Sequence, residues 1–171
     1  AALTYDKFAC NQYLKAFGVR IADSLLLRQG QSVSDEDVIG KIGLPCFIKP
    51  SLGGSSFGVT KVKVKEQIQP AIAKAFAEAK EVLVEAFMDG MEITPARIPD
   101  ELRDRVQKLT SAIYDILGAS GIIRVDYIIT EGEKINLLEV NTTPGMTATS
   151  FIPQQVRAAN LDIKDVMTDI I

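Results

Sequence analysis

The sequence contains no histidine, and this absence removes several kinds of chemistry. Without histidine, Ser-His and Cys-His nucleophilic catalysis and histidine-based zinc sites are excluded. The two cysteines, Cys10 and Cys46, lie in apolar patterns, and we interpret them as small buried hydrophobic side chains without a disulfide or metal role. Any chemistry must therefore use carboxylates, lysine, arginine and backbone amides.

A basic surplus and a long apolar run are also missing. The chain has 19 Lys and Arg against 22 Asp and Glu, and a pI near 5.1, so we expect no nucleic-acid partner. No uncharged apolar run approaches the roughly 20 residues that span a bilayer, and residues 1–8 carry charge where a signal peptide is apolar. We therefore expect no membrane partner and a cytoplasmic location.

The 171 residues, 47% of them hydrophobic, can build a sizeable core. Apolar periodicity and turn residues predict short elements that intermix without a regular βαβ order. Helices are expected over 5–17, from 34, over 66–79 and 100–117, and from 153; strands are expected over 22–27, 44–49, 60–64, 82–87, 121–130 and 134–141. This pattern predicts an α+β fold with mostly antiparallel sheets, in two subdomains of residues 1–89 and 90–171.

Charged residues gather on the last two predicted strands, which form a hairpin around Glu131-Gly132-Glu133. A symmetric, even-length loop centred on Gly132 and Glu133 places Asp126 opposite Glu139 and Arg124 opposite Asn141, all on one face. Opposed carboxylates destabilise a sheet unless a cation lies between them or one of them keeps its proton.

Oxygen ligands from Asp126, Glu139 and Asn141 suit Mg²⁺ or Mn²⁺ rather than zinc. Arg124, which has no carboxylate directly across from it, is then placed to stabilise an anion next to the metal. The alternative is a solvated hairpin face that Arg124 balances in a surface salt bridge. The apolar opposite face, with Val125, Tyr127, Leu138 and Val140, favours the metal site.

A glycine- and serine-rich segment, Ser51 to Gly58, follows the strand that ends in Lys49-Pro50. Glycines let backbone amides converge on an anion, serine hydroxyls add donors, and Lys49 adds a positive charge. The segment matches neither the Walker motif nor GxGxxG, and an ordinary turn is the alternative. Together with the metal site, it indicates a phosphate-binding loop.

Several motifs, in this order and spacing, resemble those of the D-alanine–D-alanine ligase family of the ATP-grasp superfamily. They are FIKPS with GSS and Gly58 (residues 47–58), VLVE (82–85), GME (90–92), RVD (124–126) and LLEVNTTPGMT (137–147). The resemblance runs through nearly the whole chain and implies two α+β subdomains that grip ATP. It also implies a bacterial enzyme of peptidoglycan synthesis that phosphorylates the carboxylate of one D-alanine with ATP and lets the amine of a second displace phosphate.

The resemblance also implies roles for individual residues. Lys7 and Lys49 would hold the ATP phosphates, and the loop with Gly54, Ser55 and Ser56 would close over them, with Ser55 among the catalytic residues. The remaining roles are adenine recognition by Glu85 and the backbone near Met88, ribose binding by Glu92, Mg²⁺ or Mn²⁺ ligation by Asp126, Glu139 and Asn141, oxyanion stabilisation by Arg124 and the backbone near Gly145, and binding of the second substrate's carboxylate by Ser150.

The sequence departs from the family pattern in two places. The family's N-terminal domain, which supplies a Glu and a His to the first substrate, has no counterpart, and a segment near residues 94/95 with a mobile loop and another ATP-contacting lysine is missing. We expect deletion or disorder to account for these gaps. A ligase with another second substrate, such as D-lactate, a nucleotide-binding fragment without turnover, and a homodimer all stay open.

Overall fold

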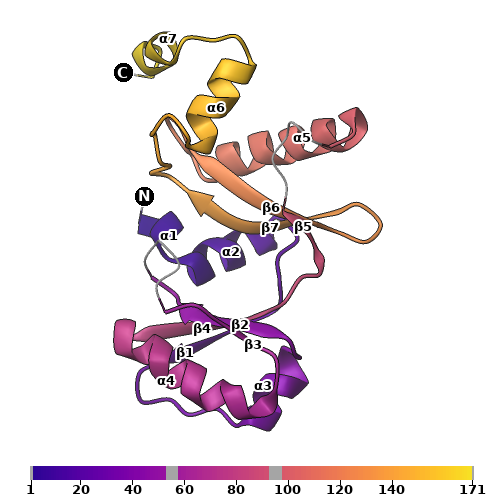
Figure 1. The fold of residues 1–171 in the computed structure, drawn as a ribbon, viewed down its shortest axis with the longest axis vertical. Coiled ribbons are helices and arrows are strands. Elements are labelled where there is room, and N and C mark those ends of the chain that lie inside the picture. Colours follow the sequence, from indigo (N-terminus) through magenta and orange to yellow (C-terminus); the bar gives the residue numbers. More distant parts are fainter. Residues whose placement is uncertain (1, 53–57, 93–97, 171) are drawn as a thin grey trace.

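The computed structural model describes residues 2–52, 58–92 and 98–170 (Figure 1). Its helices are α1 (Ala2–Tyr5), α2 (Lys7–Ala16), α3 (Asp35–Lys41), α4 (Ile68–Glu78), α5 (Asp100–Ile116), α6 (Phe151–Ala158) and α7 (Ile163–Thr168), with a 3-10 turn η1 (Lys65–Gln67) before α4. Its strands are β1 (Ser24–Arg28), β2 (Cys46–Pro50), β3 (Thr60–Val62), β4 (Glu81–Ala86), β5 (Gly90–Glu92), β6 (Arg124–Thr130) and β7 (Lys134–Asn141). None of the helices in these ranges is long and apolar enough to cross a membrane.

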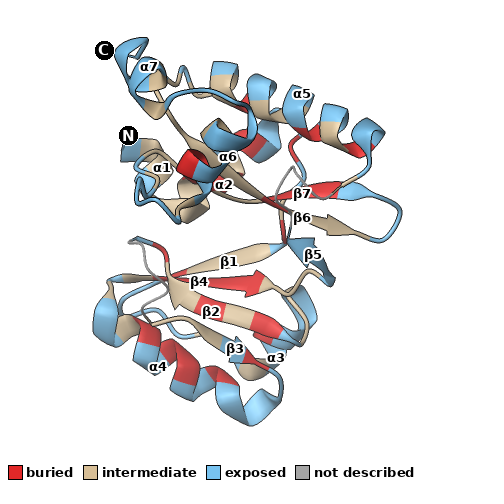
Figure 2. Cartoon of the chain, turned by 45° about the horizontal axis from the view of Figure 1, so that its top comes forward, coloured by how far each residue is buried: buried red, intermediate tan, exposed pale blue. Residues whose placement is uncertain are grey.

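The first sheet has the strand order β1-β4-β2-β3, and every neighbouring pair is antiparallel. Helices α3 and α4 cover one face of it, and their inward sides are buried (Figure 2). The core between them is formed by aliphatic side chains of both layers, including Val38, Ile48, Ile72 and Val84. Side chains alternate along a strand, so Phe47 and Lys49, which flank the core residue Ile48 on β2, point to the sheet face away from α3 and α4.

The second sheet has the order β5-β6-β7, again antiparallel. Its core contains Val106 and Ile113 of α5 together with Tyr127 and Leu137 of the sheet, and α2 adds Leu14 to the same cluster. Helices α1 and α2 lie between the two sheets (Figure 1). They hold the sheets together, since the Asn11 side chain of α2 donates to the Leu138 carbonyl of β7, and the Gln12 side chain donates to Ser24 of β1.

The hairpin of β6 and β7 corrects the loop that the sequence predicted. Thr130 pairs with Lys134, so the loop has an odd number of residues, and a positive φ at Gly132 and Glu133 closes it. A β-bulge between Asp126 and Tyr127 then shifts the register by one residue. The predicted pairs Asp126 with Glu139 and Arg124 with Asn141 are therefore confirmed, although the even-length loop from which they were derived is wrong.

The bulge also decides which residues of β7 face the core. Leu137 and Val140 are buried in the second core, whereas Leu138 is only partly buried and lines the opposite side. The expectation that Leu138 belongs to the apolar face is thus wrong. Without the extra residue, strict alternation from Leu137 would have turned Glu139 and Asn141 into the core.

Most element types agree with the sequence-based prediction, and two details differ. The first predicted helix, 5–17, corresponds to α2, which begins at Lys7 with Asp6 as its N-cap, and the separate short helix α1 precedes it. The short strand β5 follows the predicted subdomain boundary, where no helix or strand was predicted. Strand β5 is hard to see in the sequence because its three residues are exposed and carry no apolar alternation. The α+β fold with antiparallel sheets is confirmed.

Candidate active site

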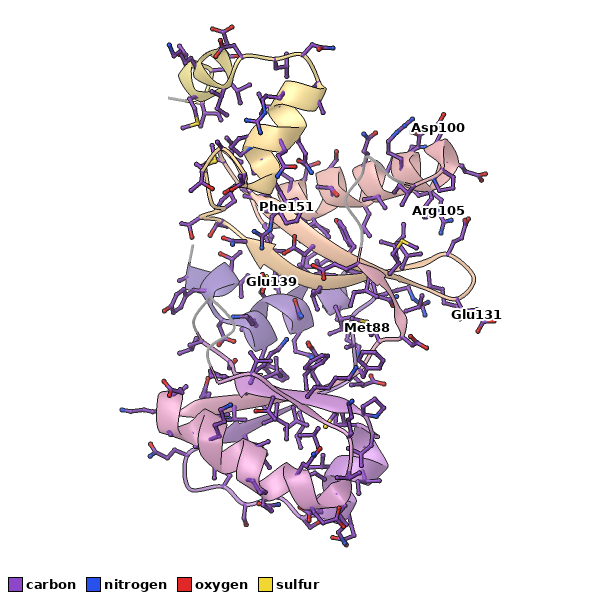
Figure 3. All side chains as sticks on the ribbon, viewed as in Figure 1. Met88, Asp100, Arg105, Glu131, Glu139 and Phe151 are labelled. Carbon is purple, nitrogen blue, oxygen red and sulfur yellow. The ribbon has the colours of Figure 1, made fainter. Side chains whose placement is uncertain are left out.

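A cleft of about 1120 Å³ lies between the two sheets. Its lining comes from β2, β4 and the segment after β4 on one side, and from β6 and β7 on the other. Nine of the predicted site residues line it: Lys7, Lys49, Glu85, Met88, Glu92, Arg124, Asp126, Glu139 and Asn141. In Figure 3, Glu139 lies on β7 and Met88 lies in the segment that joins the two sheets. One site thus collects residues from most of the length of the chain.

The wall formed by the first sheet carries a buried ion pair. The Lys49 ammonium donates to the Glu85 carboxylate at 2.6 Å, and the two side chains are 14% and 5% exposed. Lys49 is on β2 and Glu85 on the neighbouring β4, both on the face away from the first core. Because both groups are buried, removing either one is costly: the remaining charge stays buried without its hydrogen-bonded counterion.

An aromatic group closes the end of the cleft near the crossing between the sheets. The rings of Phe47 and Phe87 lie 6.1 Å apart, and both line the cleft with Met88. The Lys61 ammonium of β3 lies 3.5 Å from the centroid of the Phe87 ring, a cation–π contact. The sequence analysis missed Phe47, Phe87 and Lys61 as site residues, although the spacing of Phe47 and Lys49 already put both on one face.

Lys7 enters the cleft from the first turn of α2. Partial burial lowers the pKa of its ammonium below the ordinary value near 10.5, and the charge of Lys49 acts in the same direction. The carboxylates of Glu139 and Glu85 raise the pKa of Lys7, so charged groups of both sheets act on its ammonium. The helix that carries Lys7 places this ammonium where it can reach an anion bound between the sheets.

Arg124 pairs directly with Asn141, as predicted, but its side chain lies against the two carboxylates of the hairpin. Its guanidinium donates to both oxygens of Asp126, at 2.8 Å from Nε and 2.7 Å from Nη2, and Nη2 also reaches Glu139 at 3.3 Å. The hydrogen bond to Asp126 is the main reason why the pKa of Arg124 is raised. In this structure the positive charge that balances Asp126 and Glu139 is the Arg124 guanidinium. This agrees with the alternative to a metal site, a salt bridge from Arg124 to the hairpin carboxylates.

The hairpin residues nevertheless fit a divalent metal ion by their chemistry. Asp126 and Glu139 face each other directly, and the Asn141 amide oxygen accepts from the Thr143 amide at 2.9 Å, which leaves it a second lone pair. In the ranges that the structure describes, no three Asp, Glu, Cys or His side chains form a metal cage. Two carboxylates with an amide suit Mg²⁺, which completes its shell with water and substrate phosphates.

The remaining predicted residues lie outside the cleft lining or outside the described ranges. Gly145 and Ser150 belong to the segment between β7 and α6, and a side chain on Gly145 would come within 3.0 Å of the Ser150 hydroxyl. That hydroxyl accepts from the Thr147 amide at 3.1 Å. Gly54, Ser55 and Ser56 lie outside the described residues.

A second cavity of about 340 Å³ adjoins the cleft at Arg124. It shares Glu92, Arg124 and Asp126 with the cleft, and Phe151 and Ile152 of the first turn of α6 also line it. The ring of Phe151 lies 6.0 Å from the Arg124 guanidinium carbon. Figure 3 shows Phe151 at the start of α6, above the second sheet. The two cavities thus meet at one arginine and two carboxylates.

Comparison with known proteins identifies the fold and the family. The family model described as D-ala D-ala ligase C-terminus matches residues 13–96 and 93–171. The chain belongs to this family. Two D-alanine–D-alanine ligases, from Bacteroides fragilis and Bacteroides thetaiotaomicron, are 70% and 72% identical to it over 210 residues. These alignments cover all of this chain and 65% of each relative, so the chain spans about two thirds of their length.

Solved structures of the family agree with the fold. The VanG D-Ala:D-Ser ligase from Enterococcus faecalis is 28% identical, with a TM-score of 0.89 over 99% of this chain and 61% of that one. The D-alanine–D-alanine ligase from Bacillus anthracis complexed with ATP is 26% identical, with a TM-score of 0.85 over 98% of this chain and 63% of that one. The ATP-grasp fold that the motifs implied is therefore confirmed.

The two matched parts of the family model meet within residues 93–96, and the alignments with the relatives are longer than this chain. The relatives therefore contain residues that have no counterpart here. The subdomain boundary near residue 89 and the missing segment near 94/95 stay predictions.

Proposed function

We propose that this chain is the ATP- and metal-binding part of a ligase that joins two D-alanines to D-alanyl-D-alanine for peptidoglycan synthesis in the bacterial cytoplasm. One observation carries this proposal: a single cleft is lined both by the ammonium groups of Lys7 and Lys49 and by the opposed pair Asp126 and Glu139. Ammonium groups suit phosphate oxygens, and a carboxylate pair suits the metal that accompanies them.

The cleft has a base end and a phosphate end. Phe47, Phe87 and Met88 offer an apolar, aromatic surface to an adenine ring, and Glu85 offers a carboxylate oxygen to its amino group. Glu92 is placed for the ribose hydroxyls, and Lys7 and Lys49 for the phosphates. ATP contributes the phosphoryl group that activates a carboxylate, and the protein has to position and neutralise charge rather than supply a nucleophile.

The metal and the substrates fit around Arg124. Asp126, Glu139 and Asn141 would hold Mg²⁺ or Mn²⁺, whose positive charge would neutralise phosphate oxygens. Arg124 and the backbone near Gly145 would stabilise the oxyanion, and Ser150 the carboxylate of the second amino acid. The smaller cavity beyond Arg124 supports a compact substrate such as D-alanine, because its volume is about 340 Å³ and Phe151 and Ile152 contribute an apolar lining. The names of the relatives with 70% and 72% identity also favour D-alanine.

Calorimetry with ATP tests the metal site. The Asp126→Ala variant should lose Mg²⁺-dependent ATP affinity by about 100-fold or more, because even an outer partner of a metal ligand costs up to about 100-fold. A matched control is Glu131→Ala, which removes an exposed carboxylate at the far tip of the same hairpin (Figure 3). Unchanged Mg²⁺-dependent affinity in Asp126→Ala would reject the metal site. Phosphate release from ATP with D-alanine would separate an active ligase from a nucleotide-binding part without turnover.

A further inference from the structure

The break between α1 and α2 contacts the segment that follows β2. Asp6 pairs with Leu52 in an isolated antiparallel bridge, and the Lys7 amide donates to the Ser51 carbonyl at 3.3 Å. The Ser51 hydroxyl in turn donates to the Asp6 carboxylate at 3.1 Å. Main chain and side chains of two distant segments are thus joined at one point, which we call the Asp6–Ser51 joint.

Asp6 is held by helix α2, and Ser51 is held by the first sheet. The Asp6 carboxylate oxygen that accepts from Ser51 also accepts from the Ala9 amide at 3.0 Å, and so caps the first turn of α2. Ser51 is fully buried, and its amide donates to the Glu81 carbonyl of β4 at 2.9 Å. The joint therefore ties the start of α2 to the first sheet, with little freedom on either side.

The two lysines of the cleft sit directly next to this joint. Lys7 follows Asp6 directly in the chain, and on the other side Lys49 lies two residues before Ser51. Both ammonium groups line the same cleft but come from different elements, so their separation depends on how α2 is attached to β2. A shift of the helix start would move Lys7 and leave Lys49 in place.

We propose that Asp6 and Ser51 are positioning residues that set the spacing of Lys7 and Lys49 for the phosphates of the nucleotide, an inference that rests on the proposed function. Neither side chain is needed at the base end of the cleft, because neither lines it. The joint should therefore affect ligands with phosphates and spare a ligand that has only the base and ribose. A purely structural joint would weaken both ligands alike.

The test compares ATP with adenosine, in the presence of Mg²⁺, by calorimetry. Ser51→Ala removes the hydroxyl that links the segments and keeps the Asp6 cap of α2. It should weaken ATP binding about tenfold, the scale of one hydrogen bond, and leave adenosine binding unchanged. Asp6→Asn keeps an oxygen that can accept from both Ser51 and Ala9, so it should bind ATP nearly as the unchanged chain does. Asp6→Ala combined with Ser51→Ala should weaken ATP by less than the product of the two single effects.

Ser34→Ala is the matched control, because it removes a serine hydroxyl that accepts from the Asp37 amide and caps α3 on the far side of the first sheet. It should leave ATP affinity unchanged, and thermal unfolding would show that each variant is folded. Equal weakening of ATP and adenosine in Ser51→Ala, or no weakening at all, would overturn the inference alone. Absence of ATP binding in the unchanged chain would overturn the proposed function, and the inference with it.

Discussion

The two walls of the cleft carry charge in different ways. On the first sheet, Lys49 and Glu85 form one pair at 2.6 Å, and both side chains are nearly buried. On the hairpin, one guanidinium is shared by two carboxylates, at 2.7 Å to Asp126 and 3.3 Å to Glu139, and the three side chains are 18% to 33% exposed. The pair on the first wall is neutral, because one positive charge balances one negative charge. The group on the hairpin has two negative charges and one positive charge, so it keeps an excess of negative charge.

This difference separates a wall whose paired charges neutralise each other from a wall that can still attract a cation. A neutral buried pair is held by the fold and contributes little net attraction to a distant ion, whereas an excess carboxylate charge attracts a cation. Lys7 of α2 adds positive charge within the cleft, where the carboxylates of Glu139 and Glu85 oppose the lowering of its pKa by burial. The cleft therefore combines the ammonium groups of Lys7 and Lys49 with an excess of carboxylate charge on the hairpin, an arrangement that suits a polyphosphate together with its metal ion.

The largest expected effect is on the buried pair. Lys49→Met leaves the Glu85 carboxylate buried without its partner, and the free energy of unfolding should fall by about 3–5 kcal/mol. Arg124→Met should cost clearly less, because water still reaches Asp126 and Glu139. Urea unfolding of both variants measures the difference.

The double variant Lys49→Met with Glu85→Leu is the control for this prediction. Replacing both charges by apolar groups should restore most of the lost stability, because no buried charge remains. Equal losses in Lys49→Met and Arg124→Met, or a double variant as unstable as the single one, would contradict the distinction between the two walls.

The sequence predicted much of the hairpin wall, and the reason is physical. Charged residues at alternating positions on two adjacent strands can only meet on one face, so Asp126 and Glu139 were paired without any coordinates. The pairing was right because a bulge compensated for the wrong loop length. Bulges leave little trace in a sequence, since the extra residue, here among Leu137 and Leu138, is as apolar as its neighbours.

The other wall was harder to predict. Lys49 was found from its place before a glycine-rich segment, but its partner Glu85 was reached only through the resemblance to the ligase family. The partnership depends on β2 and β4 lying side by side although β3 and α4 separate them in the chain. The contact of Lys61 with Phe87 depends on strand pairing as well, together with side-chain conformations. Long-range pairing of this kind follows from tertiary packing, which local patterns do not encode.

The crossing between the two walls gives a second prediction. Gly90 begins β5, and a side chain there would come within 2.3 Å of the Ile129 carbonyl oxygen and 2.7 Å of an Ile128 methyl group. Gly90→Ala should therefore push β5 away from β6 and lower the free energy of unfolding by about 1–3 kcal/mol. Since Glu92 on β5 lines the cleft, ATP affinity should fall as well.

Gly40→Ala is the matched control for Gly90→Ala. Gly40 lies inside α3, and nothing lies within 4 Å of the position that an added Cβ would take. Alanine there should therefore stabilise the protein by up to about 1 kcal/mol. Urea unfolding measures both variants. A lower free energy of unfolding for Gly90→Ala and a higher one for Gly40→Ala would support the close approach of β5 and β6. A neutral Gly90→Ala would mean that the crossing is loose and that the two walls are not held at a fixed distance.

The smallest expected effect concerns Lys7 and depends on pH. Because burial lowers its pKa in the folded state, the unfolded chain binds more protons between that lowered pKa and the ordinary value near 10.5. The stability of the unchanged chain should therefore rise relative to Lys7→Met as the pH increases through this window, and at neutral pH Lys7→Met should be slightly more stable. ATP affinity should change in the opposite way, since phosphate binding needs the charged ammonium and weakens as the pH passes the lowered pKa. Thermal unfolding with and without ATP, from neutral pH to about 10, measures both trends. If ATP stabilised Lys7→Met as much as the unchanged chain at neutral pH, the Lys7 ammonium would not contribute to phosphate binding.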